Sequence, residues 1–212
     1  MLLHIGNRNY SSWSFRPWIA MRVKGIAFDV QLTPFDDEAG NPRFREFSPS
    51  GRVPALVAGA LTVWESLAIL EYLADRFPDA GWWPAEIGRR AHARSIANEM
   101  HGGFAALRHS CPMNMRRSPR SIAVSQAVDA DVARIERIWE ECLKRSGGPF
   151  LYGEFTIADA MYAPVVSRFD SYCLSQHPAS ASYGAAMKSL PAWQEWETQA
   201  RAEPWILPAE EV

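Results

Sequence analysis

The amino-acid sequence predicts an α/β domain over residues 1–78, a linker over 79–86 and an all-helical domain over 87–212. The first eighty residues alternate between short apolar runs of period two and stretches of helical spacing. A break rich in proline and glycine follows between Phe77 and Pro84. Beyond this break, apolar residues recur only at helical spacing. These three observations predict an α/β part followed by an all-α part.

Within the first domain, the elements are expected in the order βαβ and then ββα. The predicted strands are the short apolar or alternating runs 2–5, 28–32, 53–57 and 61–64. The predicted helices are 14–23 and an amphipathic helix that opens at Ser66. A polar loop with Pro34, Gly40, Asn41 and Pro42 separates the two halves. Because a parallel β-α-β crossover is almost always right-handed, this order predicts a small mixed sheet with helices packed on it, a thioredoxin-like arrangement.

The second domain is expected to be built from helices at 91–107, 121–143, 157–174 and 192–202. Thr156 and Asp159 have the spacing of a capping box, in which the threonine caps a helix and the acid reaches back from the third helical position. This pair predicts a helix start rather than a catalytic acid. The serine- and alanine-rich region 175–189 is expected to be a long connection with a short helix.

Composition excludes several classes of protein. A net charge of -2 and a pI near 6.2 provide no basic field for a nucleic acid. Arg116, Arg117 and Arg120 form the one basic cluster, which is expected to be a solvated loop between helices. No run approaches the roughly 18 to 20 apolar residues of a membrane span. The first residues are typical of a strand and not of an export signal, so we expect a cytoplasmic protein that binds neither nucleic acid nor membrane.

The three cysteines predict reduced thiols. Cys111, Cys142 and Cys173 are far apart and have no C-x-x-C or C-x-x-H pairing. This pattern is typical of a reducing compartment and argues against a disulfide framework or a zinc site. Each cysteine falls in an apolar helical context, so we expect all three to be buried and no metal to be bound.

Chemistry is predicted where the first strand meets the first helix. Unpaired N–H groups and a partial positive charge at a helix N-terminus stabilise a bound anion. Since Pro17 fits within the first turn of a helix, the helix is expected to begin near Ser14, with Ser11 and Ser12 in the preceding loop. A serine hydroxyl in this position donates a hydrogen bond to a thiolate. Such surroundings lower a thiol pKa from about 8.5 to about 3.5–7.5.

Two further segments accompany this turn. Residues 48–56 are Ser-Pro-Ser-Gly-Arg-Val-Pro-Ala-Leu, and residues 65–70 are Glu-Ser-Leu-Ala-Ile-Leu. Both resemble the glutathione-binding motifs of the cytosolic glutathione transferase family. The S-S-x-S-x-R turn that begins at Ser11 resembles that of the serine-using, zeta-type members. The resemblance is strong in the first eighty residues and weak in the helical part.

The resemblance implies a role for each matching residue. Val53 would pair its backbone with the cysteinyl part of glutathione, with Pro54 in the cis form. Glu65 would bind the ammonium of the γ-glutamyl end, while Ser66 and the amides at the helix start would bind its carboxylate. Arg52 is a candidate for the glycyl carboxylate, although a solvent-facing side chain is an equal interpretation.

Ser11 or Ser12 would face the sulfur, with Ser11 preferred. Tyr10 is an alternative hydroxyl donor, because other classes of the family use a tyrosine at the end of the first strand. Trp13 stands where zeta-type members commonly have a cysteine. No cysteine lies within 11–14, so disulfide exchange by the protein itself is not expected.

The predicted function is a glutathione transferase whose bound thiolate attacks a small, largely apolar electrophile, in a detoxification role. Alternatives within the enzymes are a glutathione-dependent isomerase, of the maleylacetoacetate isomerase kind, and a peroxidase. An alternative from another class is a non-catalytic glutathione-binding module. The residues of the electrophile site are left open. Its lining could include Met100, His101, Phe104, Arg108 and His109, or these side chains could belong to the core and to the solvent-facing side of the helical domain. The resemblance also implies a homodimer.

Overall fold

The computed structural model describes residues 1–35 and 41–212. Its four-stranded sheet has the order β2-β1-β3-β4, with β1 parallel to β2 and antiparallel to β3, and with β3 and β4 paired as a hairpin. The strands are β1 Leu2–Ile5, β2 Asp29–Leu32, β3 Ala55–Ala58 and β4 Leu61–Trp64. This is the mixed sheet that the sequence predicts. Gly40, in the predicted polar loop, lies outside the described residues.

Helix α1 (Ser12–Val23) connects β1 to β2 and begins two residues before the predicted start. Ser11 is its N-cap, so Ser12 lies in the first turn and not in the preceding loop. Pro17 lies inside the helix, and its missing N–H leaves the carbonyl of Trp13 without the usual partner four residues on. Burial of nearly the whole helix, including Phe15 and Trp18, offsets this loss. Local sequence patterns do not indicate this burial.

The hairpin leads into α2 (Ser66–Arg76), which opens at Ser66 as predicted, and a short 3-10 turn, η2 (Pro78–Ala80), follows. The remaining helices are α3 Ile87–Gly102, α4 Ala105–Ser110, α5 Gln126–Ser146, α6 Ile157–Ser171, α7 Pro178–Lys188 and α8 Pro191–Arg201. Two further 3-10 segments are η1 Pro42–Glu46 and η3 Pro208–Glu210. Within the described residues, no helix has the length and apolar character that a membrane crossing requires.

Three helical predictions differ from the structure in their details. The single helix predicted at 91–107 is two helices, because Phe104 adopts a left-handed conformation (φ 54°) that interrupts the helical hydrogen bonds. Helix α5 begins at Gln126 and not at Ser121, since Ser125 caps it by accepting a hydrogen bond from the Val128 amide. The expected connection at 175–189 contains the eleven-residue helix α7.

The predicted capping box is present at the start of α6. The fully buried carboxylate of Asp159 accepts hydrogen bonds from the Thr156 amide (2.8 Å) and hydroxyl (3.0 Å). It also accepts from the Leu151 amide (3.0 Å) and the Tyr183 hydroxyl (3.1 Å). These four bonds join the loop before α6 to α7, so Asp159 is a structural residue.

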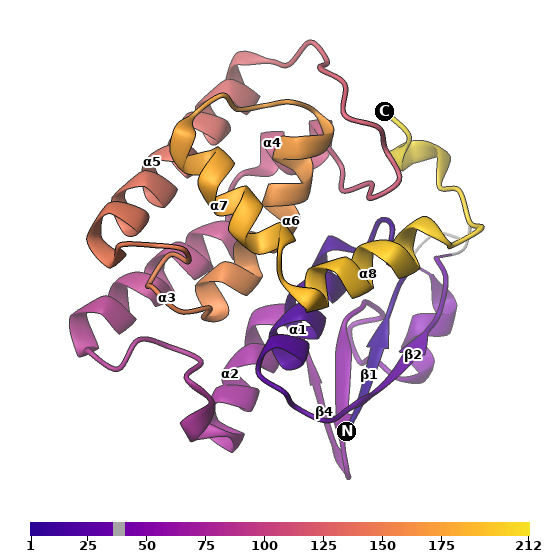
Figure 1. Cartoon of the computed structure of the whole chain (residues 1–212). Helices are drawn as coiled ribbons and strands as arrows, with labels where there is room; N and C mark the ends of the chain where they lie inside the picture. Colours follow the sequence, from indigo (N-terminus) through magenta and orange to yellow (C-terminus); the bar gives the residue numbers. More distant parts are fainter. Residues whose placement is uncertain (36–40) are drawn as a thin grey trace.

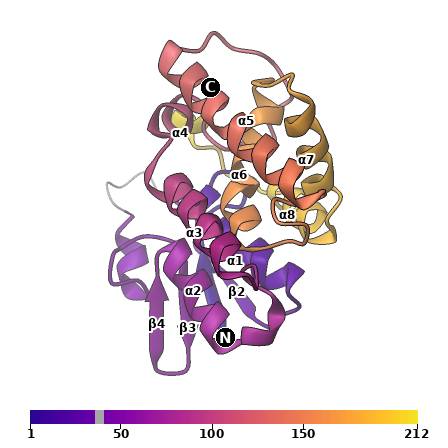
Figure 2. The ribbon, with the colours of Figure 1, turned by 90° about the vertical axis from the view of Figure 1, so that its left-hand side faces the viewer.

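The helices fasten the two parts of the chain together. Helix α1 packs on α6 and α8, and α2 packs on α3. The sheet and its helices form the lower part of the molecule in Figure 2, with α3 to α7 above. Phe15 and Trp18 of α1 pack against Trp196 of α8, with ring centroids 4.9 and 5.0 Å apart. One connected core therefore runs from β1 to α8, and it holds the start of α1 rigidly against the helical part.

Candidate active site

The two predicted serines lie side by side where β1 leads into α1. The Ser11 hydroxyl donates to the Ser14 hydroxyl (2.7 Å) and caps the helix by accepting from the Ser14 amide (3.4 Å). The Ser14 oxygen also accepts from the Gly6 amide (3.2 Å). The Ser12 hydroxyl has no hydrogen-bond partner among the described residues. In this arrangement Ser12 offers a free donor, and Ser11 belongs to a hydroxyl pair.

Tyr10, the alternative donor, is already fully engaged. Its hydroxyl donates to Glu211 (2.5 Å) and accepts from Arg116 (2.7 Å) and from the Leu207 amide (3.2 Å). These bonds hold the part of the chain that follows α8, residues 203–212, which we call the C-terminal segment. Tyr10 therefore anchors this segment and has no proton left for a ligand.

The loop with Arg116, Arg117 and Arg120, which was predicted to be solvated, is solvated only in part. Arg116 is half-buried and donates to the carbonyls of Glu203 and Trp205 (both 2.6 Å). Arg117 donates to the Val212 carbonyl. Only Arg120 is exposed. The prediction fails for the first two because the end of the chain, remote in sequence, lies beside this loop (Figure 1).

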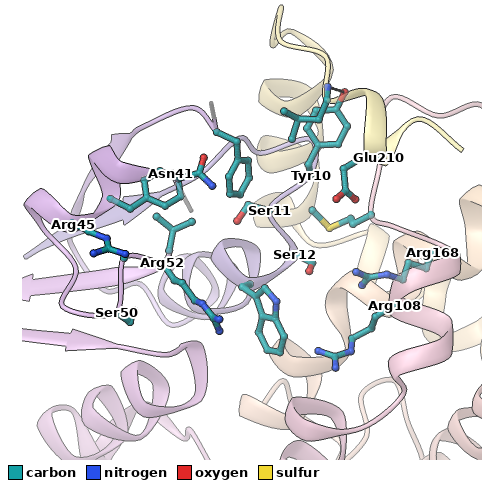
Figure 3. Close-up of a pocket in the computed structure, with 17 residues that line it drawn as sticks. Tyr10, Ser11, Ser12, Asn41, Arg45, Ser50, Arg52, Arg108, Arg168 and Glu210 are labelled. Atoms are coloured by element: carbon teal, nitrogen blue, oxygen red, sulfur yellow. Dashed lines mark hydrogen bonds between the residues drawn. The ribbon is translucent and has the colours of Figure 1, made fainter. Parts of the chain in front are cut away.

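A cavity of about 640 Å³ opens in front of the serines. Its apolar walls include Phe35, Phe44, Met113 and Leu207. Figure 3 shows Arg45 and Arg52 on one side of the serines and Arg108 and Arg168 on the other, with Glu210 beside Arg168. The cavity is therefore apolar along its walls and cationic at both ends.

Arg108 and Arg168 bring unsatisfied donors to one end of this cavity. Arg168 is buried on α6, and its Nε donates to the Cys111 carbonyl (2.9 Å). Its Nη1 and the Nε of Arg108 are buried and have no partner in the described part of the chain. Burial, with help from the charge of Arg108, lowers the pKa of Arg168 to about 10, so it stays charged near neutral pH. Two such guanidiniums attract an anion.

A second cavity of about 420 Å³ continues from the first. The two share Trp13, Ser50, Arg52 and Val53, so they form one groove. Ser66 lies in the second cavity, and its buried hydroxyl oxygen has no partner in the described residues. The bond between Val53 and Pro54 is cis, as the resemblance implies. No backbone hydrogen bond joins Val53 to another residue in 1–35 or 41–212.

Glu65 lies at the N-cap of α2 with φ 67° and an exposed carboxylate. The nearest basic group is His101, whose Nε2 lies 4.0 Å from the carboxylate. Burial lowers the pKa of His101, with a smaller contribution from Arg16, which favours the neutral imidazole. The negative charge of Glu65 is therefore left for a cation in the groove.

The indole of Trp13 divides the two lobes of the groove. The guanidinium of Arg16 lies 4.0 Å from its ring centre and that of Arg108 lies 5.3 Å away. His101 meets the ring edge-on at 5.2 Å. Arg16 is wholly buried, and burial lowers its pKa well below the usual range. Trp13 is thus held by two cation–π contacts in a fixed orientation.

The structure brings all seven predicted site residues to this groove: Ser11, Ser12, Arg52, Val53, Pro54, Glu65 and Ser66. Of the residues left open for the electrophile, Arg108 and His101 line it, while Met100 and Phe104 are buried in the core and His109 is exposed. Sequence reasoning missed Arg168 and Glu210. Arg168 is the one arginine in the predicted helix 157–174, which was a signal for it, whereas no local pattern signals Glu210.

The cysteines lie outside the groove. Cys111 and Cys142 are buried, as predicted, but Cys173 is exposed. It follows the end of α6 with a positive φ of 53°, where the chain turns out toward solvent. In the described residues no three His, Cys, Asp or Glu side chains gather as a metal site would require.

Comparison with known proteins identifies the family. A model of the glutathione S-transferase N-terminal domain matches residues 10–76, and a model of the glutathione S-transferase C-terminal domain matches residues 122–199. Together they match more than half of the chain. The chain belongs to the glutathione S-transferase family. The family predicted from the sequence is confirmed, and the predicted enzyme class agrees with it.

Two relatives that match most of the chain are named maleylacetoacetate isomerase and zeta-class glutathione S-transferase. The rat (Rattus norvegicus) maleylacetoacetate isomerase is 28% identical over 191 residues, which cover 87% of this chain and 87% of that protein. A glutathione S-transferase of the zeta class from Euphorbia esula is 29% identical over 195 residues, covering 87% and 84%.

Solved structures of glutathione S-transferases share the fold. A bacterial maleyl pyruvate isomerase of the zeta class superposes with a TM-score of 0.72 at 23% identity, covering 96% of this chain and 99% of that one. A glutathione transferase homolog from Burkholderia, with bound glutathione, superposes with a TM-score of 0.69 at 22% identity, covering 94% and 97%. The predicted fold class is thereby confirmed.

Proposed function

We propose that this glutathione S-transferase ionises the thiol of bound glutathione at the start of α1 and directs the thiolate at a small electrophile that carries a carboxylate. One observation carries the proposal. A single groove connects the serine hydroxyls at the N-terminus of α1 with the guanidinium groups of Arg108 and Arg168, each of which keeps an N–H group without a partner in the described residues. The end at the serines suits the thiolate of glutathione, and the end at the arginines suits a carboxylate of the second substrate.

Glutathione would occupy the lobe around Val53. Its γ-glutamyl ammonium would meet Glu65, and its γ-glutamyl carboxylate would meet the unpartnered Ser66 hydroxyl and the first amides of α2. The unpaired backbone of Val53 would hold the cysteinyl part as an added strand does. Arg52, which is exposed and lines both lobes, would meet the glycyl carboxylate.

The sulfur would then lie at the N-terminus of α1. Ser12 supplies the hydroxyl that has no internal partner. Ser11 becomes a second donor if its pair with Ser14 reverses, so that Ser14 donates to Ser11 and Ser11 donates to the sulfur. The helix dipole favours the same negative charge. Each unit by which the thiol pKa falls corresponds to about 1.4 kcal/mol of thiolate stabilisation.

The second substrate would combine a small apolar body with a carboxylate. Phe35, Met113 and Leu207 contact the apolar part, and Arg108 and Arg168 bind the carboxylate. This charge preference favours one alternative in particular, isomerisation of a cis-unsaturated keto acid, in which the thiolate adds to the double bond, the adduct rotates and the thiolate leaves again. The relatives named maleylacetoacetate isomerase support it.

The test uses four proteins: wild type, Ser11→Ala, Ser12→Ala and the double variant. We expect retention on immobilised glutathione for all four. In the wild type we expect isomerisation of a cis-unsaturated diketo acid and thiol consumption with an aryl halide. The bound thiol pKa, read by ultraviolet absorbance, should rise by about one unit in Ser12→Ala and further in the double variant. Retention without either reaction would identify a non-catalytic binding module, and an unchanged pKa would refute the serine assignment.

We further propose a homodimer in the cytoplasm with a role in detoxification. Leu61 and Trp64 on the edge strand β4 are large apolar side chains left 48% and 41% exposed, which suits burial against a second copy. The free thiols of all three cysteines are those that a reducing compartment preserves. Light scattering at micromolar concentration tests the dimer, and a monomeric mass would contradict it.

A further inference from the structure

A further cavity opens in the helical part of the molecule, where α5, α6 and α7 meet. Helix α7 packs on both α5 and α6 (Figure 1). The cavity between them measures about 290 Å³ and has Trp139, Val166 and Phe169 among its apolar walls. We call it the α5–α7 cavity. Because ligand pockets usually measure about 300–1,000 Å³, a cavity of this size suits a small molecule.

Helix α6 separates the α5–α7 cavity from the groove. Val166, Phe169 and Asp170 line this cavity and, being three and four residues apart, share one face of α6. Arg168 lies on another face of the same helix and lines the groove. Among the described residues, none lines both. The α5–α7 cavity is therefore distinct from the site of the proposed function.

Two hydrogen-bond donors at this cavity have no acceptor. The indole Nε1 of Trp139 and the hydroxyl of Ser180 are buried, and neither bonds to any residue in the described ranges. Trp139 has no exposed surface, and Ser180 is 8% exposed. An indole N–H can only donate, and a buried donor without an acceptor is unfavourable. Since Trp139 lies on α5 and Ser180 on α7, an oxygen atom in the cavity would satisfy donors from two helices.

The remaining polar side chains at the cavity are already paired. The Lys188 ammonium bonds to the Asp170 carboxylate at 2.9 Å. The Ser175 hydroxyl donates to Glu136. Because the lysine and the aspartate neutralise each other, a carboxylate in this cavity would meet no unpaired cation. The cavity thus combines apolar walls with two uncharged donors.

We propose that the α5–α7 cavity binds a small, uncharged aromatic carbonyl compound, whose oxygen accepts hydrogen bonds from Trp139 and Ser180. Its ring would pack against the aromatic side chains of Trp139 and Phe169. Uncharged donors suit a carbonyl oxygen, whereas the guanidinium groups of the groove suit a carboxylate. The alternative occupant is water, which accepts from the same donors but gains nothing from the apolar walls.

The indole signals in ¹H–¹⁵N NMR spectra of the whole protein test this proposal. The chain has nine tryptophans, and Trp139→Phe identifies the signal of Trp139. Acetophenone is compared with α-methylstyrene, which has the same shape but a CH2 group in place of the oxygen. Acetophenone should shift the Trp139 signal downfield and bind about tenfold more tightly than α-methylstyrene, because its oxygen accepts from the two donors. Benzoate, which is charged, should leave this signal in place.

Ser180→Ala and Ser182→Ala form a matched pair on α7. The Ser182 side chain is exposed, does not line the cavity and donates to the Ala179 carbonyl. Ser180→Ala should weaken the binding of acetophenone about fivefold and leave that of α-methylstyrene unchanged. Ser182→Ala should change neither.

Three results would overturn the proposal. A Trp139 signal that does not move at about 10 mM acetophenone, tenfold above a millimolar Kd, would show that water alone satisfies the donors. Equal affinities for acetophenone and α-methylstyrene would show that the oxygen is not recognised. Equal effects of Ser180→Ala and Ser182→Ala would show that the Ser180 hydroxyl does not contact the ligand. None of these measurements involves glutathione, so their failure would leave the proposed function untouched.

Discussion

Replacing Tyr10 with Phe should release the C-terminal segment without changing how the thiol is ionised. The substitution removes one oxygen and the three hydrogen bonds that it makes to Glu211, Arg116 and the Leu207 amide. Two of these partners are charged, and bonds to charged groups contribute about 1.5–3 kcal/mol each when buried. Both side chains are partly exposed, so water replaces much of what is lost.

A net loss of about 2 kcal/mol for the docked segment follows from these contacts, which corresponds to about a thirtyfold increase in local opening. Hydrogen exchange followed by mass spectrometry measures it directly. Peptides from 203–212 should exchange about thirtyfold faster in Tyr10→Phe, while peptides from α6 should be unchanged. Tyr152→Phe is the matched control, because the Tyr152 hydroxyl bonds to His92 (2.7 Å) far from this segment.

The same variant tests the thiol. Because the Tyr10 proton is donated to Glu211, the pKa of bound glutathione in Tyr10→Phe should equal that of the wild type. A rise of about one unit or more in Tyr10→Phe, with no rise in the Ser11 and Ser12 variants, would show that tyrosine is the sulfur's partner. Exchange of the segment at the wild-type rate would refute the anchoring role.

Two further substitutions have expected outcomes. Asp159→Ala should lower the free energy of unfolding by about 3 kcal/mol or more, measured by urea denaturation. The reason is that the buried donors that now bond to the Asp159 carboxylate would be left without a partner. A loss below about 1 kcal/mol would contradict this reasoning. Ser14→Ala should raise the bound thiol pKa by about half a unit to one unit while retention on immobilised glutathione persists, because Ser11 loses the hydroxyl that orients it. Ser14→Thr keeps that hydroxyl and should restore the wild-type pKa.

The sequence predicted best what is encoded over short spans. The hairpin, the opening of α2 at Ser66 and the capping box of Thr156 and Asp159 each depend on residues a few positions apart, so local spacing is sufficient evidence. The residues predicted for the lobe around Val53 come from two short motifs in one small domain, whereas Trp13 and His101, which also line it, come from α1 and α3.

What the sequence did not predict depends on contacts between distant segments. Arg168 reaches the groove because α6 packs on α1, and Glu210 reaches it because Tyr10 and Arg116 hold the end of the chain. The early start of α1 despite Pro17 has the same cause, since the helix is stabilised by burial against α6 and α8 and not by its own sequence. No local sequence pattern indicates these contacts between distant segments.

The two serines and the two arginines of the groove lie on different elements, α1 with its N-cap on one side and α4 and α6 on the other. Under the proposed function, thiol ionisation depends on the start of α1, where Phe15 and Trp18 are buried in the core. The charge of the second substrate depends on Arg108 and Arg168, which lie on α4 and α6 and have no hydrogen bond to the serines or to each other in the described residues. A substitution of either arginine should therefore alter which electrophile is accepted while the thiolate stays ionised.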